Sequence, residues 1–239
     1  MALVRIDKIV SSAGNFSRKE ARLLIKSGRV SVDGITVKSA DEKYDPDEKS
    51  IFVDGMKLNF EMLHYFMMNK PAGYISSTDD PRDKTVLELV PEEYSRLKLF
   101  PAGRLDKDAE GLLILTDDGQ YCHNVISPNK NVYKKYYVKV DGQLTKEDIE
   151  KFSEGMKMAD GTEFLPGKLE ILSENEGYVY IREGKFHQVK RMLAHIGKPV
   201  LYLKRVSIGN LELDPAIEKG KMKKISPEEA ALVFGLKAQ

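Results

Sequence analysis

The sequence predicts an α+β protein in which a small N-terminal unit precedes a larger domain built on a mostly antiparallel sheet. Three observations support this fold class. Two short helical patterns and a hairpin signal occupy the first 38 residues, strand-like segments outnumber helical patterns after about residue 59, and the order of these segments is irregular. A chain of 239 residues is long enough for both parts to bury a core. We therefore expect domains at residues 1–58 and 59–239.

The N-terminal unit is predicted from helix and turn signals. Residues 5–12 repeat apolar side chains with the period of an α-helix. Ser17 opens a second helix with a capping box, because Glu20 stands three residues later, and Gly28 provides a C-terminal stop. Asp33-Gly34, between two alternating segments, is a strong signal for a two-residue hairpin turn. The unit is therefore two small helices followed by a hairpin.

Basic side chains gather on the second of these helices. Arg18, Arg22 and Lys26 recur every four residues, so they lie on one side of the helix. The net charge of the whole chain is +1, but residues 1–38 hold eight basic and three acidic side chains, which gives +5. We interpret this local charge as a surface for a polyanion, with an ordinary solvated helix face as the alternative.

This unit resembles the alpha-L RNA-binding fold, the S-four domain. The matching residues are R-I-D-K-I-V at 5–10, S-R-K-E-A-R-L-L-I-K-S-G-R-V at 17–30 and V-D-G at 32–34. The resemblance covers roughly the first 58 residues and implies RNA binding without chemistry. The candidate RNA contacts are basic residues of this unit: Arg5, Arg18, Lys19, Arg22, Lys26 and Arg29.

The larger domain is predicted from short apolar segments. An acidic stretch with a proline at 41–48 is expected to be a loop, followed by a strand at 51–53. The expected strands of the second domain are Tyr65–Met68, Leu112–Leu115, Tyr136–Val140, Leu169–Leu172, Tyr178–Ile181 and Val206–Leu213. The expected helices are Val86–Leu89, Thr145–Glu154 and His187–Ile196.

Several common kinds of site are excluded by the motifs. The segment 161–168 has glycines and a lysine like a phosphate loop, but its spacing is one residue too long and Leu169 replaces the hydroxyl that binds Mg²⁺. The four histidines and the single cysteine show no metal-ligand spacing. No G-x-S-x-G or G-x-G-x-x-G motif is present. We therefore expect no metal, no nucleotide and no other cofactor.

The most unusual segment spans residues 100–119. Gly103 and Gly111 bracket a charged loop that runs into an apolar strand, and the loop holds Asp106 and Asp108 beside basic neighbours. A loop anchored by a strand is a usual place for site residues, although a solvated turn is the alternative.

This segment resembles the signature of the pseudouridine synthases that act on ribosomal RNA. G-R-L-D at 103–106 is followed, after four residues, by G-L-L-I-L-T-D-D-G at 111–119. The resemblance covers almost the whole chain, because other family blocks occur in the expected order: N-K-P-A-G at 69–73, K-K-Y at 134–136 and G-K-F-H-Q-V-K-R-M at 184–192. One departure is Ala109, where many members have Ser or Thr, so a hydroxyl that would brace the loop is lost.

The resemblance implies the isomerisation of uridine to pseudouridine and assigns the catalytic residues. Asp106 is the catalytic carboxylate, and it acts either by nucleophilic attack or by removing a ribose proton. Tyr136 is the active-site tyrosine that faces the uracil, with Tyr133 and Tyr137 as rivals for that position. Lys190 occupies the basic position that pairs with Asp106 and keeps it ionised. The reaction needs no redox or metal chemistry, in agreement with the missing cofactor motifs.

The same resemblance implies contacts with a flipped-out target. A uridine inside folded RNA has to leave its stack to be reached, and Arg104 is expected to fill the vacated space or hold a flanking phosphate. The lysines within residues 130–139 and the block at residues 184–192 are expected to supply further phosphate contacts. The candidate residues for these contacts are Lys134, His187, Gln188 and Arg191.

The expected substrate is ribosomal RNA or a pre-ribosomal particle. Segments 76–81, 117–123 and 127–128 resemble the enzymes for the small-subunit (16S) RNA more than those for the large subunit, which remain the alternative. A non-catalytic ribosome-assembly factor is a further alternative, whereas an RNA methyltransferase would need a glycine-rich cofactor loop. One cysteine and no secretion or membrane signal favour a cytoplasmic protein, expected to be a monomer.

Overall fold

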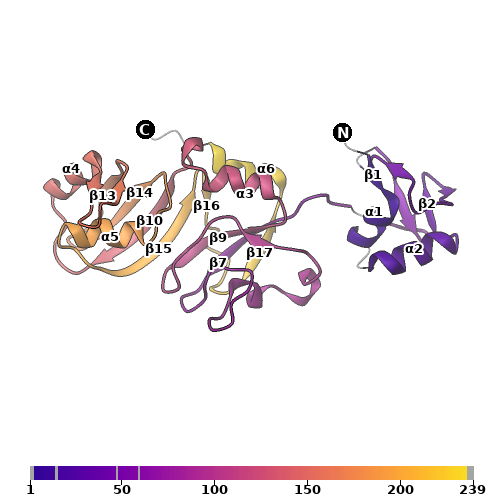
Figure 1. Cartoon of the computed structure of the whole chain (residues 1–239), viewed down its shortest axis with the longest axis horizontal. Helices are drawn as coiled ribbons and strands as arrows, with labels where there is room; N and C mark the ends of the chain where they lie inside the picture. The colour runs from indigo at the N-terminus through magenta and orange to yellow at the C-terminus, as the bar shows by residue number, and fades with distance from the viewer. Residues whose placement is uncertain (1–2, 14–15, 47, 59, 236–239) are drawn as a thin grey trace. The chain divides into compact units, whose positions relative to one another are not determined.

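The computed structural model describes residues 3–13, 16–46, 48–58 and 60–235. The chain forms two compact units, residues 1–62 and residues 63–239 (Figure 1). Asn59, at which the sequence places the start of the second domain, lies outside the described residues. No helix in the described ranges combines the length and the apolar character needed to cross a membrane.

The N-terminal unit contains the expected helices and hairpin. A capping box starts helix α2, with the Ser17 amide 2.6 Å from the Glu20 carboxylate and the Glu20 amide 3.2 Å from the Ser17 hydroxyl. Asp33 and Gly34 form the hairpin turn with φ of +49° and +82°. Both helices bury an apolar face against the strands. The elements are β1 Val4–Arg5, α1 Ile6–Ala13, α2 Arg18–Lys26, β2 Val30–Val32, β3 Ile35–Thr36, β4 Lys43–Tyr44, β5 Ile51–Val53 and β6 Met56–Lys57.

The larger unit is built on one mixed, mostly antiparallel sheet, in agreement with the predicted fold class. Its main path runs β13-β14-β10-β15-β9-β7-β17, with β16 paired to β15 and β8 paired to β9. These strands are β7 Tyr65–Lys70, β8 Phe100–Pro101, β9 Glu110–Thr116, β10 Lys134–Val140, β13 Lys168–Ile171, β14 Glu176–Ile181, β15 Val200–Ile208, β16 Leu211–Glu212 and β17 Met222–Ile225. A separate small hairpin joins β11 Met156–Lys157 to β12 Glu163–Phe164.

Both faces of this sheet are covered. Successive side chains of a strand point to opposite faces, so Leu113 and Leu115 of β9 enter one core while Leu112 and Ile114 enter the other. Helices α3 and α6 lie over the second core (Figure 1). The helical elements are α3 Gly119–Ile126, α4 Lys146–Glu154, α5 Gln188–His195 and α6 Pro227–Ala231, with 3₁₀ turns at Val86–Leu89, Glu92–Tyr94, Pro128–Lys130 and Leu232–Phe234.

One pairing of the central sheet is parallel. It joins β15 to β9, with Lys204 opposite Glu110 and Arg205 opposite Gly111. Gly111 is required there, because a Cβ on it would lie 2.2 Å from the Arg205 carbonyl oxygen and its φ is +102°. Because Gly111 and Arg205 are so close, the start of β9 packs directly on β15. The end of the 103–110 loop is therefore fixed next to β15 as well.

The structure departs from the sequence expectations in several elements, and the helix predicted at Val86–Leu89 is a short 3₁₀ turn. Helix α3 and strand β17 are not among the predicted elements, and the strand predicted at 206–213 is two strands separated by a turn at Gly209 and Asn210. Helix α3 begins at an Asp118 cap, whose carboxylate accepts from the Gln120 and Tyr121 amides. In the sequence, Asp118 lies within residues 117–123, a segment interpreted as a loop. For this reason the cap is not recognised there as the start of a helix.

Candidate active site

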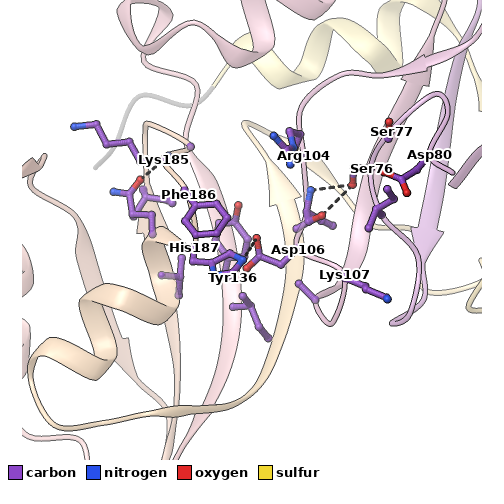
Figure 2. A pocket seen from close by; sticks show the side chains of 18 residues that line it. Ser76, Ser77, Asp80, Arg104, Asp106, Lys107, Tyr136, Lys185, Phe186 and His187 are labelled. Carbon is purple, nitrogen blue, oxygen red and sulfur yellow. Dashed lines mark hydrogen bonds and ion pairs between the residues drawn. The ribbon is translucent and has the colours of Figure 1, made fainter. Parts of the chain in front are cut away.

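A cavity of about 640 Å³ opens beside the loop that carries Asp106. Its lining comes from five stretches far apart in the sequence, and Figure 2 shows the side chains that face it. Asp106, Tyr136 and His187 approach one another across the cavity, while Ser76 and Arg104 lie on the other side of Asp106. The structure therefore brings two of the three predicted catalytic residues to one cavity.

Lys190, the third, reaches Asp106 from helix α5. Its ammonium Nζ lies 3.2 Å from Asp106 Oδ2, so the predicted ion pair is present. The same ammonium lies 2.5 Å from Asp108 Oδ1. Asp106 keeps only 24% of its side-chain surface, whereas Asp108 keeps 74%. Lys190 thus joins a half-buried carboxylate that faces the cavity to an exposed one that does not line it.

Electrostatics keep Lys190 and Asp108 charged near neutral pH. Burial by itself would lower the pKa of Lys190, but the hydrogen bond to Asp108 and the charge of Asp106 outweigh it, so the pKa of Lys190 is raised. The hydrogen bond from Lys190 in turn lowers the pKa of Asp108. The ammonium therefore stays protonated and presents a fixed positive charge to Asp106.

The backbone of the Asp106 loop is held from outside by side chains. The Ser76 hydroxyl accepts from the Leu105 amide at 3.0 Å and donates to the Leu105 carbonyl at 3.1 Å. The amide of Gly73 donates to the Lys107 carbonyl at 2.7 Å. These contacts fix the residues on both sides of Asp106, and so fix the direction in which its carboxylate points.

Lys70 provides the largest number of contacts to this loop. It is the last residue of β7 and is 0% exposed. Its ammonium donates to the carbonyl oxygens of Asp106 at 3.0 Å, Lys107 at 3.3 Å and Ala109 at 2.7 Å, and to that of Pro71 at 3.0 Å. Burial lowers the pKa of Lys70 to about 8. The Lys70 ammonium thus holds carbonyl oxygens of the loop on both sides of Asp108.

Of the three tyrosines considered from the sequence, Tyr136 is the one that lines the cavity in the described structure. It is 7% exposed on β10 and faces the same space as Asp106. Tyr137 points the other way and packs edge-on against Tyr178 and Tyr202. Tyr133 lies just before β10, where its carbonyl accepts from the Gly209 amide. Strand alternation therefore selects Tyr136.

Arg205 supports both Tyr136 and the loop. It is 3% exposed and pairs with Tyr136 at a register shift between β10 and β15, with its guanidinium 6.0 Å from the centre of the Tyr136 ring. Its Nε donates to the Leu112 carbonyl at 2.8 Å and its Nη1 to the Arg104 carbonyl at 3.3 Å. An irregular strand pairing next to a site redirects side chains, and here it aims Arg205 under the loop.

His187 joins the site through an uncommon backbone conformation. Its φ of +49° lies in the left-handed region, directly before α5. Its imidazole stacks on the ring of Phe186 with centroids 3.8 Å apart, and its Nε2 lies 3.7 Å from Asp106 Oδ1. Phe186 is 70% exposed on the cavity wall. Non-glycine residues rarely adopt this conformation, and at an active site it orients a side chain.

The other residues of this unit that are predicted to contact RNA differ in their exposure and in whether they line the cavity. Arg104 is exposed on the cavity wall. Gln188 also lines the cavity but is 3% exposed, and its amide donates to Glu183 at 2.9 Å. Arg191 lies 2.7 Å from Asp160 and does not line the cavity.

Lys134 does not have the surface position that the sequence predicts. It is 6% exposed, and its ammonium donates to the carbonyls of Val125 at 3.1 Å and Val132 at 2.7 Å. Alternation along β10 turns Lys134 inward together with Tyr136. Burial lowers its pKa to about 8. A contact with phosphate at the outer surface therefore does not fit its position.

In the N-terminal unit the predicted basic residues fall into two groups. Arg5 and Arg22 both bind the carboxylate of Asp7, which is fully buried, and Arg29 binds Asp54. Burial by itself would raise the pKa of Asp7, but the two arginines lower it. The second group, without an ion pair in the described part of this unit, consists of the exposed residues Arg18, Lys19 and Lys26.

Sequence reasoning missed three residues that shape the site. In the sequence Lys70 stands out only as part of a family block, Ser76 only as part of a loop signature, and Arg205 only as one of several basic residues. A lysine at the end of an apolar strand, or an arginine in the inward register between Leu203 and Ser207, is a signal that would have found two of them. In the described part of the chain no group of three His, Cys, Asp or Glu side chains is placed to hold a metal ion.

Comparisons with known proteins identify the family of each unit. The model of the RNA pseudouridylate synthase family matches residues 64–195, and that of the S4 domain matches residues 4–49. The chain therefore belongs to the RNA pseudouridylate synthase family, whose members isomerise uridine in RNA, and it carries an N-terminal S4 domain.

Relatives match over nearly their full length. An uncharacterized RNA pseudouridine synthase of Bacillus subtilis is 42% identical, covering 96% of this chain and 98% of the relative. The ribosomal small subunit pseudouridine synthase A of Escherichia coli is 38% identical, covering 96% of this chain and 100% of the relative. A crystal structure of a pseudouridylate synthase matches with a TM-score of 0.68 and 33% identity over 96% of this chain and 99% of the other.

Proposed function

We propose that this protein isomerises a specific uridine of small-subunit (16S) ribosomal RNA to pseudouridine, with Asp106 as the catalytic carboxylate. The observation that carries the proposal is the position of Asp106, half-buried in a cavity with Tyr136 and paired with Lys190. The names of the Escherichia coli and Vibrio cholerae relatives support the small subunit as the substrate. The proposed substrate locates the reaction in the cytoplasm, where the ribosomes of these bacterial relatives assemble.

Each side chain of the cavity has a task in this reaction. The bond between N1 of uracil and C1′ of ribose breaks, the base turns while it is held, and a new bond forms between C5 and C1′. C5 then loses its proton, and N1 gains one. Asp106 either attacks the nucleotide or removes a ribose proton, and Lys190 balances its charge. Tyr136 offers a ring face against the base, and the walls of the cavity keep the detached uracil from diffusing away. The protein performs these steps without a nucleotide cofactor and as a monomer.

Contacts with the rest of the RNA are proposed for exposed cations. Arg104 is an exposed residue of the cavity lining, and it takes the place of the flipped-out base or holds the adjacent phosphate. In the S4 domain, Arg18, Lys19 and Lys26 are the residues best placed to bind phosphate, because they are exposed. Arg5, Arg22 and Arg29 bind carboxylates and contribute to RNA binding only as part of that surface.

Mapping of pseudouridine in total RNA tests the substrate. Cells lacking this protein are expected to lose one pseudouridine in small-subunit RNA, which returns with the wild-type gene and not with the Asp106→Asn variant. Loss of a pseudouridine in large-subunit RNA instead would contradict the proposed substrate. RNA labelled at C5 of uridine separates an isomerase from a non-catalytic assembly factor, because only the isomerase releases the label.

A further inference from the structure

A second cavity, of about 730 Å³, lies directly beside the first. The two cavities share part of their walls, including Ser76, Arg104 and Tyr136. Asp106 lines the first cavity and not the second, so the second is not where the target uridine reacts. Arg104 and Tyr136 therefore stand between the reaction site and a neighbouring space of similar size.

Two buried cations border this second cavity. Lys134 is 6% exposed and Arg205 is 3% exposed. The Lys134 ammonium has three N–H donors and uses two of them on the Val125 and Val132 carbonyls. Arg205 uses Nε and Nη1, while its buried Nη2 has no hydrogen-bond partner in the described structure. Buried donors are nearly always paired, so Arg205 Nη2 lacks, among the described residues, the acceptor that such a group usually has.

The rest of the lining favours a flat, partly apolar ligand. Apolar side chains also line this cavity: Pro101, Ala102, Val125, Ile126 and Ile208. The acidic side chain on the lining is Glu183, whose Oε1 already accepts from the Leu165 amide and the Gln188 amide. The cavity thus combines apolar side chains with two cations, one of which has a donor unpaired within the described chain, and this combination suits a nucleotide with its ring face and its carbonyl or phosphate oxygens.

We propose that the second cavity binds the nucleotide next to the target uridine in the same RNA strand. Its base lies against the wall formed by Val125 and Ile126, and an oxygen of the nucleotide accepts from Lys134 and Arg205. When the target base flips out, its neighbour loses its stacking partner. Because the two cavities share the wall at Arg104, two consecutive nucleotides can occupy them at the same time. The proposal rests on the proposed RNA-modifying function and adds a second binding position to it.

The test combines a protein variant with an RNA variant. Ile126→Glu introduces a carboxylate on the apolar wall, at a side chain that is 47% exposed. Leu172→Glu is the matched control, since Leu172 is 48% exposed and lines neither cavity. The RNA contains the uridine found by pseudouridine mapping, with an abasic site placed 5′ or 3′ of it in turn. KM and kcat are measured for each pair of protein and RNA.

The expected result is that KM changes and kcat does not. One of the two abasic sites raises KM for the wild-type protein about tenfold, the usual value of one stacked base, and Ile126→Glu raises KM on intact RNA to a similar extent. When Ile126→Glu acts on the RNA with that abasic site, KM is no higher than with either change alone. Leu172→Glu has the KM of the wild type. Unchanged kcat and melting temperature show that the Ile126→Glu variant is folded.

Two outcomes would overturn the proposal. If neither abasic site changes KM, the cavity does not hold a neighbouring base. If the effects of Ile126→Glu and the abasic site multiply, the new charge repels RNA in general and the pocket is not occupied. A mapped uridine outside small-subunit RNA would contradict the proposed substrate and not this inference, because the test uses whichever RNA the protein modifies.

Discussion

Basic side chains are used in opposite ways in the two units of this protein. In the S4 domain, Arg18, Lys19 and Lys26 extend into solvent from helix α2. In the catalytic unit, Lys70 and Arg205 are buried and bind backbone carbonyls around the Asp106 loop. Exposed cations attract phosphate at long range, whereas buried cations fix a backbone. The difference separates affinity for RNA from the geometry of the reaction, and mutations in each unit test that separation.

The largest expected effect follows from Asp106→Asn. The substitution keeps the shape of the side chain but removes the carboxylate, so turnover should fall at least about a thousandfold while RNA affinity stays unchanged. Turnover is measured by release of a label from C5 of uridine, and affinity by titration with the same RNA. Asp108→Asn is the matched control and should remain active, since Asp108 does not line the cavity. Activity that persists in Asp106→Asn would refute the assignment.

The next effect concerns Lys70→Met, which keeps the aliphatic stem but leaves the loop carbonyls without their donor. We expect kcat to fall about a hundredfold, because a small misplacement of a catalytic group has that cost. Unsatisfied buried carbonyls should also lower the free energy of unfolding by about 1–3 kcal/mol. RNA affinity should not change. A variant with normal kcat would show that the loop holds its geometry without Lys70.

The pH dependence of stability gives an independent test of Lys70. Its pKa is lowered by burial to about 8, from the ordinary value of 10.5. Between these values the unfolded chain binds more protons than the folded protein, so rising pH favours the folded state. The unfolding free energy of the wild type, relative to Lys70→Met, should therefore increase from pH 8 to pH 10 by on the order of 2 kcal/mol. Chemical denaturation at several pH values measures it, and a constant difference would contradict the shift.

The smallest effect is expected in the S4 domain. The double variant Arg18→Gln, Lys26→Gln should reduce the slope of log K against log salt by roughly 0.7–0.9 for each phosphate that these side chains neutralise in the wild type. Arg22→Gln is the contrasting variant, because Arg22 binds the buried Asp7. It should lower stability by about 1–2 kcal/mol and change the slope little. Equal slopes for wild type and the double variant would mean that α2 does not touch phosphate. Neither protein should differ from wild type in kcat.

Several features of this protein were determined by the sequence alone. Helix α2, its capping box and the Asp33-Gly34 turn depend on residues within four positions of one another, so local patterns predict them. The continuous apolar run Leu112–Leu115 that predicts strand β9 is equally local. The family signature around Asp106 is also a pattern of nearby residues, so the sequence alone reveals it.

The tertiary structure decided which cations are buried and what they bind. Lys134 looks like a surface lysine in the sequence, but its register in β10 turns it inward beside Tyr136. Arg205 reaches the Leu112 and Arg104 carbonyls only because β15 pairs in parallel with β9, and 93 residues separate Arg205 from Leu112. The physical reason is that periodicity is a property of neighbours along the chain, whereas a strand's partner is chosen by packing between distant segments.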